Sequence, residues 1–279
     1  MATRRGFLQQ ALAAGGVLAL PGIRPGSGAE PEPVLTPAAS DEKAGAEVHH
    51  LSIGILIFPR MDQVDFTGPF EVLSRVPRTT THVLWKEKGP IRDIKGLILT
   101  PEVALAEAPP LDVLVVPGGP GQQELMDDEE VLSFIRDRAG RARYVYSVCT
   151  GALICGAAGL LKGVRTTTHW ASFDLLKYFG AIPVNERVVR DGKHLSAAGV
   201  TAGIDGALRL ASLLRGDQAA QAIQLAIEYA PEPPFHSGTP ATAPAEVLKA
   251  VQAQTHELTR QRRSTAKRIA ARLQVVVED

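Results

Sequence analysis

The fold of this chain is decided by residues 144–152, which read YVYSVCTGA. A run of apolar and β-branched residues ends at Cys149, and small residues that suit a helix follow at once. This pattern predicts a strand, a sharp turn at the cysteine and then a helix. At such a turn, backbone N–H groups and the positive end of the helix dipole point toward the sulfur. We therefore expect Cys149 to favour the thiolate, which is the nucleophilic form. The alternative is a cysteine that only packs in the core.

The turn resembles the nucleophile elbow of α/β hydrolases, with Cys149 in the place of the serine. The other cysteine, Cys155, would lie nearly two turns into the following helix, too far from Cys149 to pair with it. The two lack a CxxC spacing, and no His/Cys cluster accompanies them. We predict that Cys155 is a packing residue and that the chain has no metal site.

Length and charge limit the possible functions. The chain has 279 residues, with 30 basic and 30 acidic side chains. That length allows one sizeable core with appendages, and the zero net charge implies neither nucleic acid nor a strongly acidic partner. No apolar run reaches the roughly 18 residues of a membrane-spanning helix, so we expect no stable membrane association.

The first fifty residues are not expected to belong to the fold. Residues 1–29 combine Arg4-Arg5, an apolar run over 11–20 and small residues at 27–29, a pattern typical of a twin-arginine-type signal peptide. Residues 30–50 form a Pro/Ala-rich linker. These features predict export through the twin-arginine translocon and a periplasmic or secreted mature protein.

The last segment, residues 245–279, is predicted to form a C-terminal helix. A rough apolar stripe runs along it: Val247, Leu248, Val251, Leu258, Ile269 and Leu273. Its polar face is basic: Arg260, Arg262, Arg263, Lys267, Arg268 and Arg272. One basic helix lacks the second helix and the turn of a helix-turn-helix unit. We expect this helix to pack on the core or across a dimer.

Residues 51–244 alternate between apolar runs of strand length and amphipathic stretches. This alternation predicts an α/β fold with a doubly wound, mostly parallel sheet, a flavodoxin-like three-layer sandwich. Strands are expected at 51–58, 82–86, 96–100, 111–116, 144–148, 188–190 and 194–197, and helices at 69–75, 127–138, 170–178, 202–214 and 218–229. A site is expected beyond the carboxyl ends of the strands, where the loops bearing Asp65, Gly118-Gly119 and Cys149 converge.

Two of these loops carry candidates to act with the cysteine. Asp65 is a carboxylate next to an apolar pocket, where its pKa would be raised and it could move a proton. Its alternative role is a helix cap, although Thr67 could fill that role. The backbone N–H groups of Gly119 and Thr150 are candidates for an oxyanion hole; the alternative for the glycines is a tight turn without chemistry. His169 is a secondary candidate for a base.

Several motifs together resemble the ThiJ/PfpI superfamily, which is class I glutamine amidotransferase-like. They are DFTGP (65–69), VVPGG (115–119), SVCTG (147–151) and THW (168–170), and the likeness continues in order to about Pro244. The chain is most similar to the isonitrile hydratase (cyclohexyl-isocyanide hydratase) branch. AraC-type regulators carry a similar domain.

The resemblance implies a catalytic site of Cys149, Asp65 and Thr150. Cys149 matches the nucleophile, Asp65 the acidic residue against its sulfur, and Thr150 the neighbouring threonine. The implied reaction is hydration of isocyanides, a small-molecule substrate, to N-substituted formamides without a cofactor. We expect the protein to be a homodimer. Two alternatives stay open: a non-catalytic ligand- or redox-sensing domain related to the regulators, and a thiol hydrolase or glyoxalase-like enzyme acting on another small electrophile.

Overall fold

The computed structural model describes residues 49–277. The predicted signal peptide (1–29) and most of the linker (30–50) therefore lie outside the described residues. The helices are α1 (Gln63–Leu73), α2 (Gln122–Leu125), α3 (Glu129–Arg141), α4 (Gly151–Ala157), α5 (Ala202–Arg215), α6 (Asp217–Ala226) and α7 (Ala245–Arg272), with 3₁₀ segments η1 (Leu105–Glu107) and η2 (Trp170–Phe179). No helix among these residues is both long enough and apolar enough to span a membrane.

A seven-stranded sheet forms the centre, in the order β10-β11-β7-β6-β1-β2-β5. Neighbouring strands are parallel except for the β10–β11 hairpin. Strand order reverses between β1 and β6, which is where open α/β sheets place their sites. The predicted mostly parallel sheet is confirmed. Its strands are β1 (Leu51–Leu56), β2 (Thr79–Trp85), β5 (Val103–Ala104), β6 (Val113–Val116), β7 (Tyr144–Val148), β10 (Val188–Asp191) and β11 (His194–Ala197).

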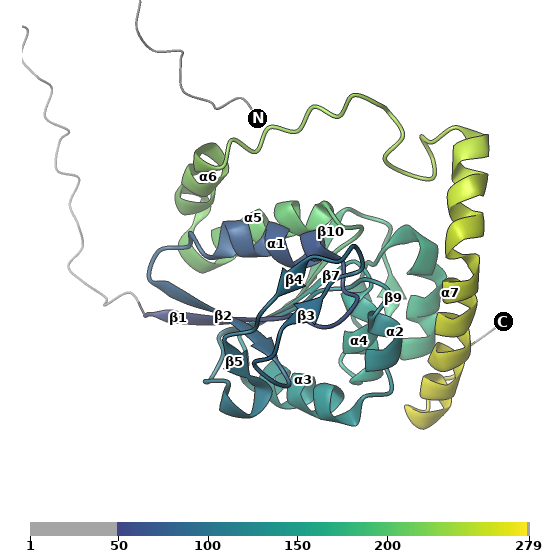
Figure 1. Cartoon of the computed structure of the whole chain (residues 1–279), viewed down its shortest axis with the longest axis horizontal. Coiled ribbons are helices and arrows are strands. Elements are labelled where there is room, and N and C mark those ends of the chain that lie inside the picture. Colours follow the sequence, from purple (N-terminus) through teal and green to yellow (C-terminus); the bar gives the residue numbers. More distant parts are fainter. Residues whose placement is uncertain (1–48, 278–279) are drawn as a thin grey trace, which may run out of the picture. The chain divides into compact units, whose positions relative to one another are not determined.

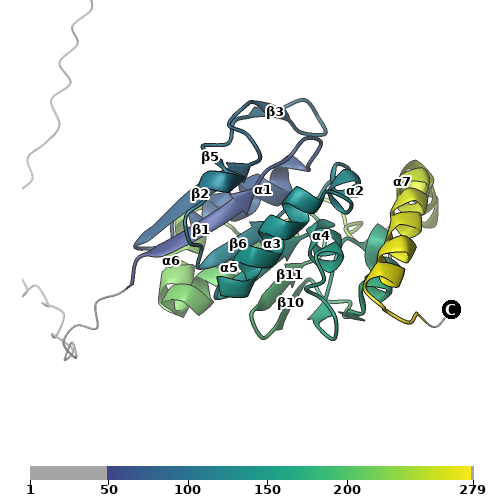
Figure 2. The ribbon, with the colours of Figure 1, turned by 90° about the horizontal axis from the view of Figure 1, so that it is seen from below.

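Helices cover both faces of this sheet. Helices α1 and α5 pack together on one face, while α3 and α4 lie on the other (Figure 1 and Figure 2). Helix α7 packs against η2 beside this core. Two small pairs lie outside the central sheet: β3 (Ile91–Arg92) with β4 (Ile98–Leu99), and β8 (Arg165–Thr166) with β9 (Ile182–Pro183).

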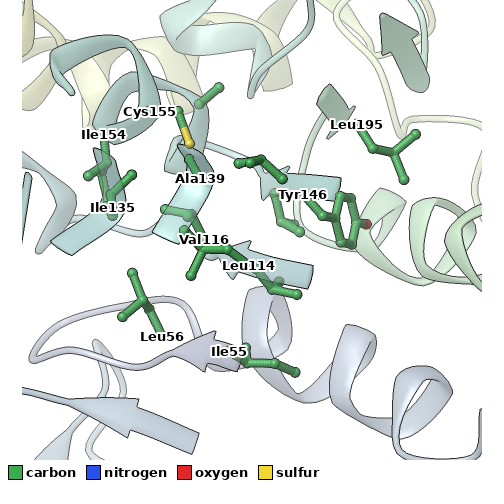
Figure 3. Packing of buried hydrophobic residues seen from close by; sticks show 14 of the residues in the cluster. Ile55, Leu56, Leu114, Val116, Ile135, Ala139, Tyr146, Ile154, Cys155 and Leu195 are labelled. Carbon is green, nitrogen blue, oxygen red and sulfur yellow. The ribbon is translucent and has the colours of Figure 1, made fainter. Parts of the chain in front are cut away.

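The core between the layers combines the apolar side chains of the predicted strands with those of the flanking helices. Strand β6 is buried along its whole length, as a central parallel strand should be. Figure 3 shows Cys155 of α4 near Ile154 of the same helix and near Ile135 and Ala139 of α3. Cys155 is fully buried, and burial raises the pKa of its thiol to about 12. The predicted packing role fits this position.

The largest differences between the predicted and observed helix ends occur in α1 and α7. Helix α1 begins at Gln63, six residues before the expected start at Pro69. Proline favours the first turn of a helix, but Asp62 caps this one by accepting a hydrogen bond from the Val64 N–H at 3.0 Å. Helix α7 ends at Arg272, and Gln274 just beyond it adopts a left-handed φ of 54°.

Candidate active site

Cys149 stands at the predicted turn between β7 and α4. Its φ of 54° lies in the left-handed region, where a side chain other than glycine is strained. Both of its backbone polar groups are held: its N–H donates to the Ala197 carbonyl at 3.0 Å, and its carbonyl accepts from the Thr168 hydroxyl at 2.7 Å. Neighbouring strand and loop therefore fix the position from which the sulfur is presented.

Asp65 lies in the first turn of α1 and is fully buried. Its Oδ2 accepts a hydrogen bond from the Gly118 N–H at 2.9 Å, and its carboxyl group also interacts with the Cys149 thiol. Burial, and then the charge of Asp62, raise the pKa of Asp65 to about 7, although the nearby Cys149 thiol and the Gly118 N–H oppose this rise. The expected direction of this pKa shift is confirmed, and the acid sits against the sulfur.

The capping role considered for Asp65 belongs to Asp62 instead. Thr67, expected to be the alternative cap, lies inside α1, where its hydroxyl donates to the Gln63 carbonyl at 2.9 Å. The prediction that Thr67 caps the helix was wrong because the helix begins one turn earlier. Asp65 is free of a capping function all the same.

The expected low pKa of Cys149 was wrong for the resting site. Only 5% of this residue is exposed, and burial, followed by the negative charge of Asp65, raises the pKa of its thiol well above the ordinary value. The Thr150 N–H and the charge of Arg262 act in the opposite direction. A neutral thiol beside a carboxyl group is the stable form, so the thiolate must be generated by transfer of its proton.

Gly119 was expected to offer its N–H to a reacting atom. That N–H instead donates to the Thr150 hydroxyl at 3.1 Å, so its role as an oxyanion donor is not supported. Gly119 has a φ of 117°, and a Cβ here would come within 2.2 Å of the Asp62 nitrogen. Gly119 is thus needed for the close approach of two loops. Of the two N–H groups predicted as oxyanion donors, only that of Thr150 interacts with the sulfur.

His169 caps the start of η2 and does not act as a base toward Cys149 in this arrangement. Its Nδ1 accepts a hydrogen bond from the Ala171 N–H at 3.3 Å, which leaves the ring proton on Nε2. Burial, and then the nearby charge of Arg262, lower the pKa of His169 to about 4. The ring is neutral near pH 7, and its lone pair is already used.

Sequence reasoning missed Arg262, which it placed on the polar face of the C-terminal helix. This side chain is buried, with Nη2 donating to the Gly119 carbonyl at 3.0 Å and Nη1 to the Ser172 hydroxyl at 3.3 Å. Nothing in the sequence separates Arg262 from the other arginines of α7, which also lie within one or two turns of apolar residues.

A cleft of about 710 Å³ opens beside the site. Its wall includes Thr168, whose hydroxyl holds the Cys149 carbonyl, and His169. The rings of Trp170 and Phe173 and the segment around Pro240 supply apolar surface. The cleft therefore provides room for a small organic molecule on the Thr168 side of the cysteine loop, although neither Cys149 nor Asp65 is among its lining residues. Among residues 49–277, no group of three or more His, Cys, Asp or Glu side chains is arranged to hold a metal ion.

Residues 51–213 match the model of the DJ-1/PfpI family. The chain belongs to the DJ-1/PfpI family. A THiJ/PfpI family protein from Pseudomonas syringae superposes with a TM-score of 0.77 at 38% identity, covering 84% of this chain and 99% of that one. The central sheet of this chain, flanked by helices, thus has the DJ-1/PfpI fold.

Two similar proteins have names that state a function. Isonitrile hydratase from Pseudomonas putida is 50% identical over 223 residues, which is 80% of this chain and 98% of that protein. The transcriptional regulator GbdR from Pseudomonas aeruginosa is 27% identical over 180 residues, which is 62% of this chain and 49% of the regulator. The first likeness is the stronger and covers nearly a whole protein.

Proposed function

We propose that this protein is an isonitrile hydratase, which hydrates isocyanides to N-substituted formamides with Cys149 as nucleophile. The observation that carries the proposal is the 50% identity to an isonitrile hydratase over 98% of that protein's length. The paired thiol and carboxyl group of Cys149 and Asp65 supply the chemistry that this reaction needs.

In the first step, Asp65 takes the proton of the Cys149 thiol. A carboxyl group whose pKa lies at about 7 is half ionised near neutral pH, which suits it to accept and return a proton. The sulfur then forms a bond to the terminal carbon of the isocyanide, and Asp65 returns the proton to that carbon. The product of this step is a thioimidate in which carbon carries sulfur, hydrogen and the doubly bonded nitrogen.

In the second step, water adds to the thioimidate carbon. Asp65, now a carboxylate, takes a proton from the water and passes it to the nitrogen. The tetrahedral adduct then expels sulfur, its hydroxyl proton returns to the Asp65–Cys149 pair, and the formamide leaves. One water is consumed, and the thiol and the carboxyl group end as they began, so the cycle itself needs no further co-reactant.

Thr150 orients these groups from the position after the nucleophile. Its N–H lies at the sulfur, and its hydroxyl accepts the Gly119 N–H. Because the two loops are joined through this hydroxyl, Thr150 couples the cysteine turn to the loop that holds Asp65 through Gly118. We assign the substituent of the isocyanide to the cleft, against the apolar surface of Trp170 and Phe173.

The test is turnover of a panel of isocyanides, amides and 2-oxoaldehydes, with formamide followed by chromatography. We expect formamide from isocyanides, no turnover by Cys149→Ala, and near-normal turnover by Cys155→Ala, since Cys155 packs within α4 away from the turn. Turnover of amides or 2-oxoaldehydes without isocyanides would instead support the hydrolase or glyoxalase-like alternative. Isocyanide turnover by Cys149→Ala would show that Cys149 is not the nucleophile.

We further propose that the protein is exported and acts in the periplasm as a homodimer. Support for export is the sequence pattern of Arg4-Arg5 and the small residues at 27–29. Lysine at both arginines is expected to leave the precursor in the cytoplasm, detected by fractionation and by the N-terminal sequence of the mature chain. An unprocessed cytoplasmic wild-type chain would contradict export, and the mass of the native particle tests the dimer.

A further inference from the structure

Arg262 of α7 is a buried cation that the proposed reaction does not use. The residue is 6% exposed, and within the described part of the chain its guanidinium bonds only to neutral oxygens, the Gly119 carbonyl and the Ser172 hydroxyl. Its Nε has no hydrogen-bond partner among residues 49–277. The ion pairs of α7 within that range run through Arg260 and Arg268, not through Arg262.

A buried charge without a counter-charge is costly, and such charges are normally paired. The cost is visible in the guanidinium itself, since burial lowers the pKa of Arg262 to about 10. The one group that counteracts this lowering is Cys149. Arg262 in turn opposes the rise in the pKa of the Cys149 thiol, so the two side chains act on each other.

Other titratable groups around the sulfur do not fill this role. Asp65, on α1, raises the pKa of the thiol because it is an acid. His169, beside Arg262, is neutral above about pH 4. Arg262 is therefore the cation whose charge opposes the rise in the pKa of the Cys149 thiol.

We propose that Arg262 is the positioning residue that supplies the counter-charge for the Cys149 thiolate, so that helix α7 completes the site. When the S–H proton passes to Asp65, the electron pair of the broken bond stays on sulfur. The new negative charge then gains a buried cation that Gly119 links to Thr150, the residue after Cys149, and that has no counter-charge among the described residues. The total charge of the three groups does not change. This inference rests on the proposed nucleophilic role of Cys149 but not on which electrophile it attacks.

The same guanidinium holds the loop that organises the site. Through the Gly119 carbonyl, Arg262 fixes the residue whose N–H donates to the Thr150 hydroxyl. Gly119 and Arg262 are 143 positions apart, so the C-terminal helix reaches directly into the loop between β6 and α2. Substitutions that keep or remove the positive charge of Arg262 can separate its electrostatic effect on Cys149 from its hydrogen bond to the loop.

The experiment measures the pH dependence of alkylation of Cys149 by iodoacetamide, with mass spectrometry of the labelled peptides and Cys155 as internal reference. Arg262→Met removes the charge, Arg262→Lys keeps it, and Arg268→Gln alters an exposed arginine of the same helix that pairs with Asp127. We expect Arg262→Met to shift the inflection of the Cys149 profile upward by a pKa unit or more. That shift slows alkylation about tenfold or more at neutral pH.

Arg262→Lys and Arg268→Gln are expected to keep the wild-type inflection. Because replacing an uncompensated buried charge by an apolar side chain is often neutral or stabilising, Arg262→Met should fold. A folded Arg262→Met with the wild-type profile would overturn the proposal. Should Arg262→Met fail to fold, Arg262→Lys decides: an unchanged inflection supports the charge role, and an inflection raised by a unit or more refutes it.

This outcome is separate from that of the proposed function. Alkylation uses no isocyanide, so a wild-type protein without isocyanide turnover leaves the role of Arg262 open to the same test. Conversely, alkylation that ignores Arg262 would leave isocyanide hydration standing.

Discussion

At the residue scale, burial dominates the acid–base properties of Cys149 and Asp65. The sequence predicted a thiolate from the backbone N–H groups and the helix dipole, effects worth about 0.3–1 kcal/mol at exposed sites. Removing a charge from water costs more than this, and both groups are almost completely buried. The pKa of each is raised, so the proton is shared within the pair rather than lost to solvent.

The buried acid is expected to reduce stability at neutral pH. Its pKa rises on folding from 3.8 to about 7, so the folded protein binds more protons than the unfolded chain between these values. The contribution of Asp65 to the free energy of unfolding is thus full below about pH 4 and is lost as the pH rises through about 7.

Asp65→Asn keeps the size of the side chain and an acceptor for the Gly118 N–H but does not ionise. We expect this variant to be more stable than wild type at about pH 8 and to show little difference at about pH 4. Urea unfolding at the two pH values measures this. An Asp65→Asn protein that is less stable than wild type at the higher pH would mean that the charged carboxylate stabilises the fold.

At the element scale, the turn between β7 and α4 could be predicted from the sequence, because the pattern lies within nine residues. Strand β7 has the predicted bounds, 144–148. Gly151 explains why the helix follows so tightly: a Cβ here would come within 2.0 Å of the Val116 carbonyl oxygen at the end of β6. The local residue types predict the turn, and the neighbouring strand β6 explains why its glycine is needed.

The start of α1 and the buried face of α7 could not be predicted in the same way. Asp62 and Thr67 are both good caps, and only the fold decides between them. On α7, Thr265, Ala266, Ile269 and Ala270 face the core together with Arg262, whereas Val247 and Val251 of the expected apolar stripe are exposed. Contacts with η2 and with the Gly119 loop determine which face of α7 is buried. The periodicity of the helix sequence carries no information about these tertiary contacts.

At the scale of the whole molecule, the sheet topology brings the predicted strand ends together. Asp65 follows β1, Gly118 and Gly119 follow β6, and Cys149 follows β7. These strands are neighbours in the sheet, so their loops meet, as hydrogen bonds from Gly118 to Asp65 and from Gly119 to Thr150 show. The alternation of strands and helices in the sequence was enough to predict that these loops meet at the carboxyl edge of the sheet.

What the topology did not predict is the part of the site that comes from outside the sheet. Arg262 and Ser172 come from α7 and η2, and no sequence spacing links them to the loop of Gly119. The structure therefore adds a cation to a site that the sequence predicted as a cysteine with an acid. The roles of Cys149, Asp65 and Thr150 stay predictions until the variants are measured.

The central claim is that Asp65 moves the protons of a Cys149-dependent isocyanide hydration. The measurement that tests it most directly is the pH dependence of kcat/KM for wild type and Asp65→Asn. Since the carboxylate is the form that takes the thiol proton, kcat/KM of wild type should rise with pH through about 7. Asp62→Asn is a matched control: it keeps the cap but removes a charge that raises the pKa of Asp65, so its inflection should shift downward with the rate retained.

For Asp65→Asn we expect kcat/KM to fall by about 10² to 10⁴, the usual contribution of a general acid–base, and the inflection near pH 7 to disappear. An Asp65→Asn enzyme with the wild-type rate and the wild-type pH profile would contradict the account.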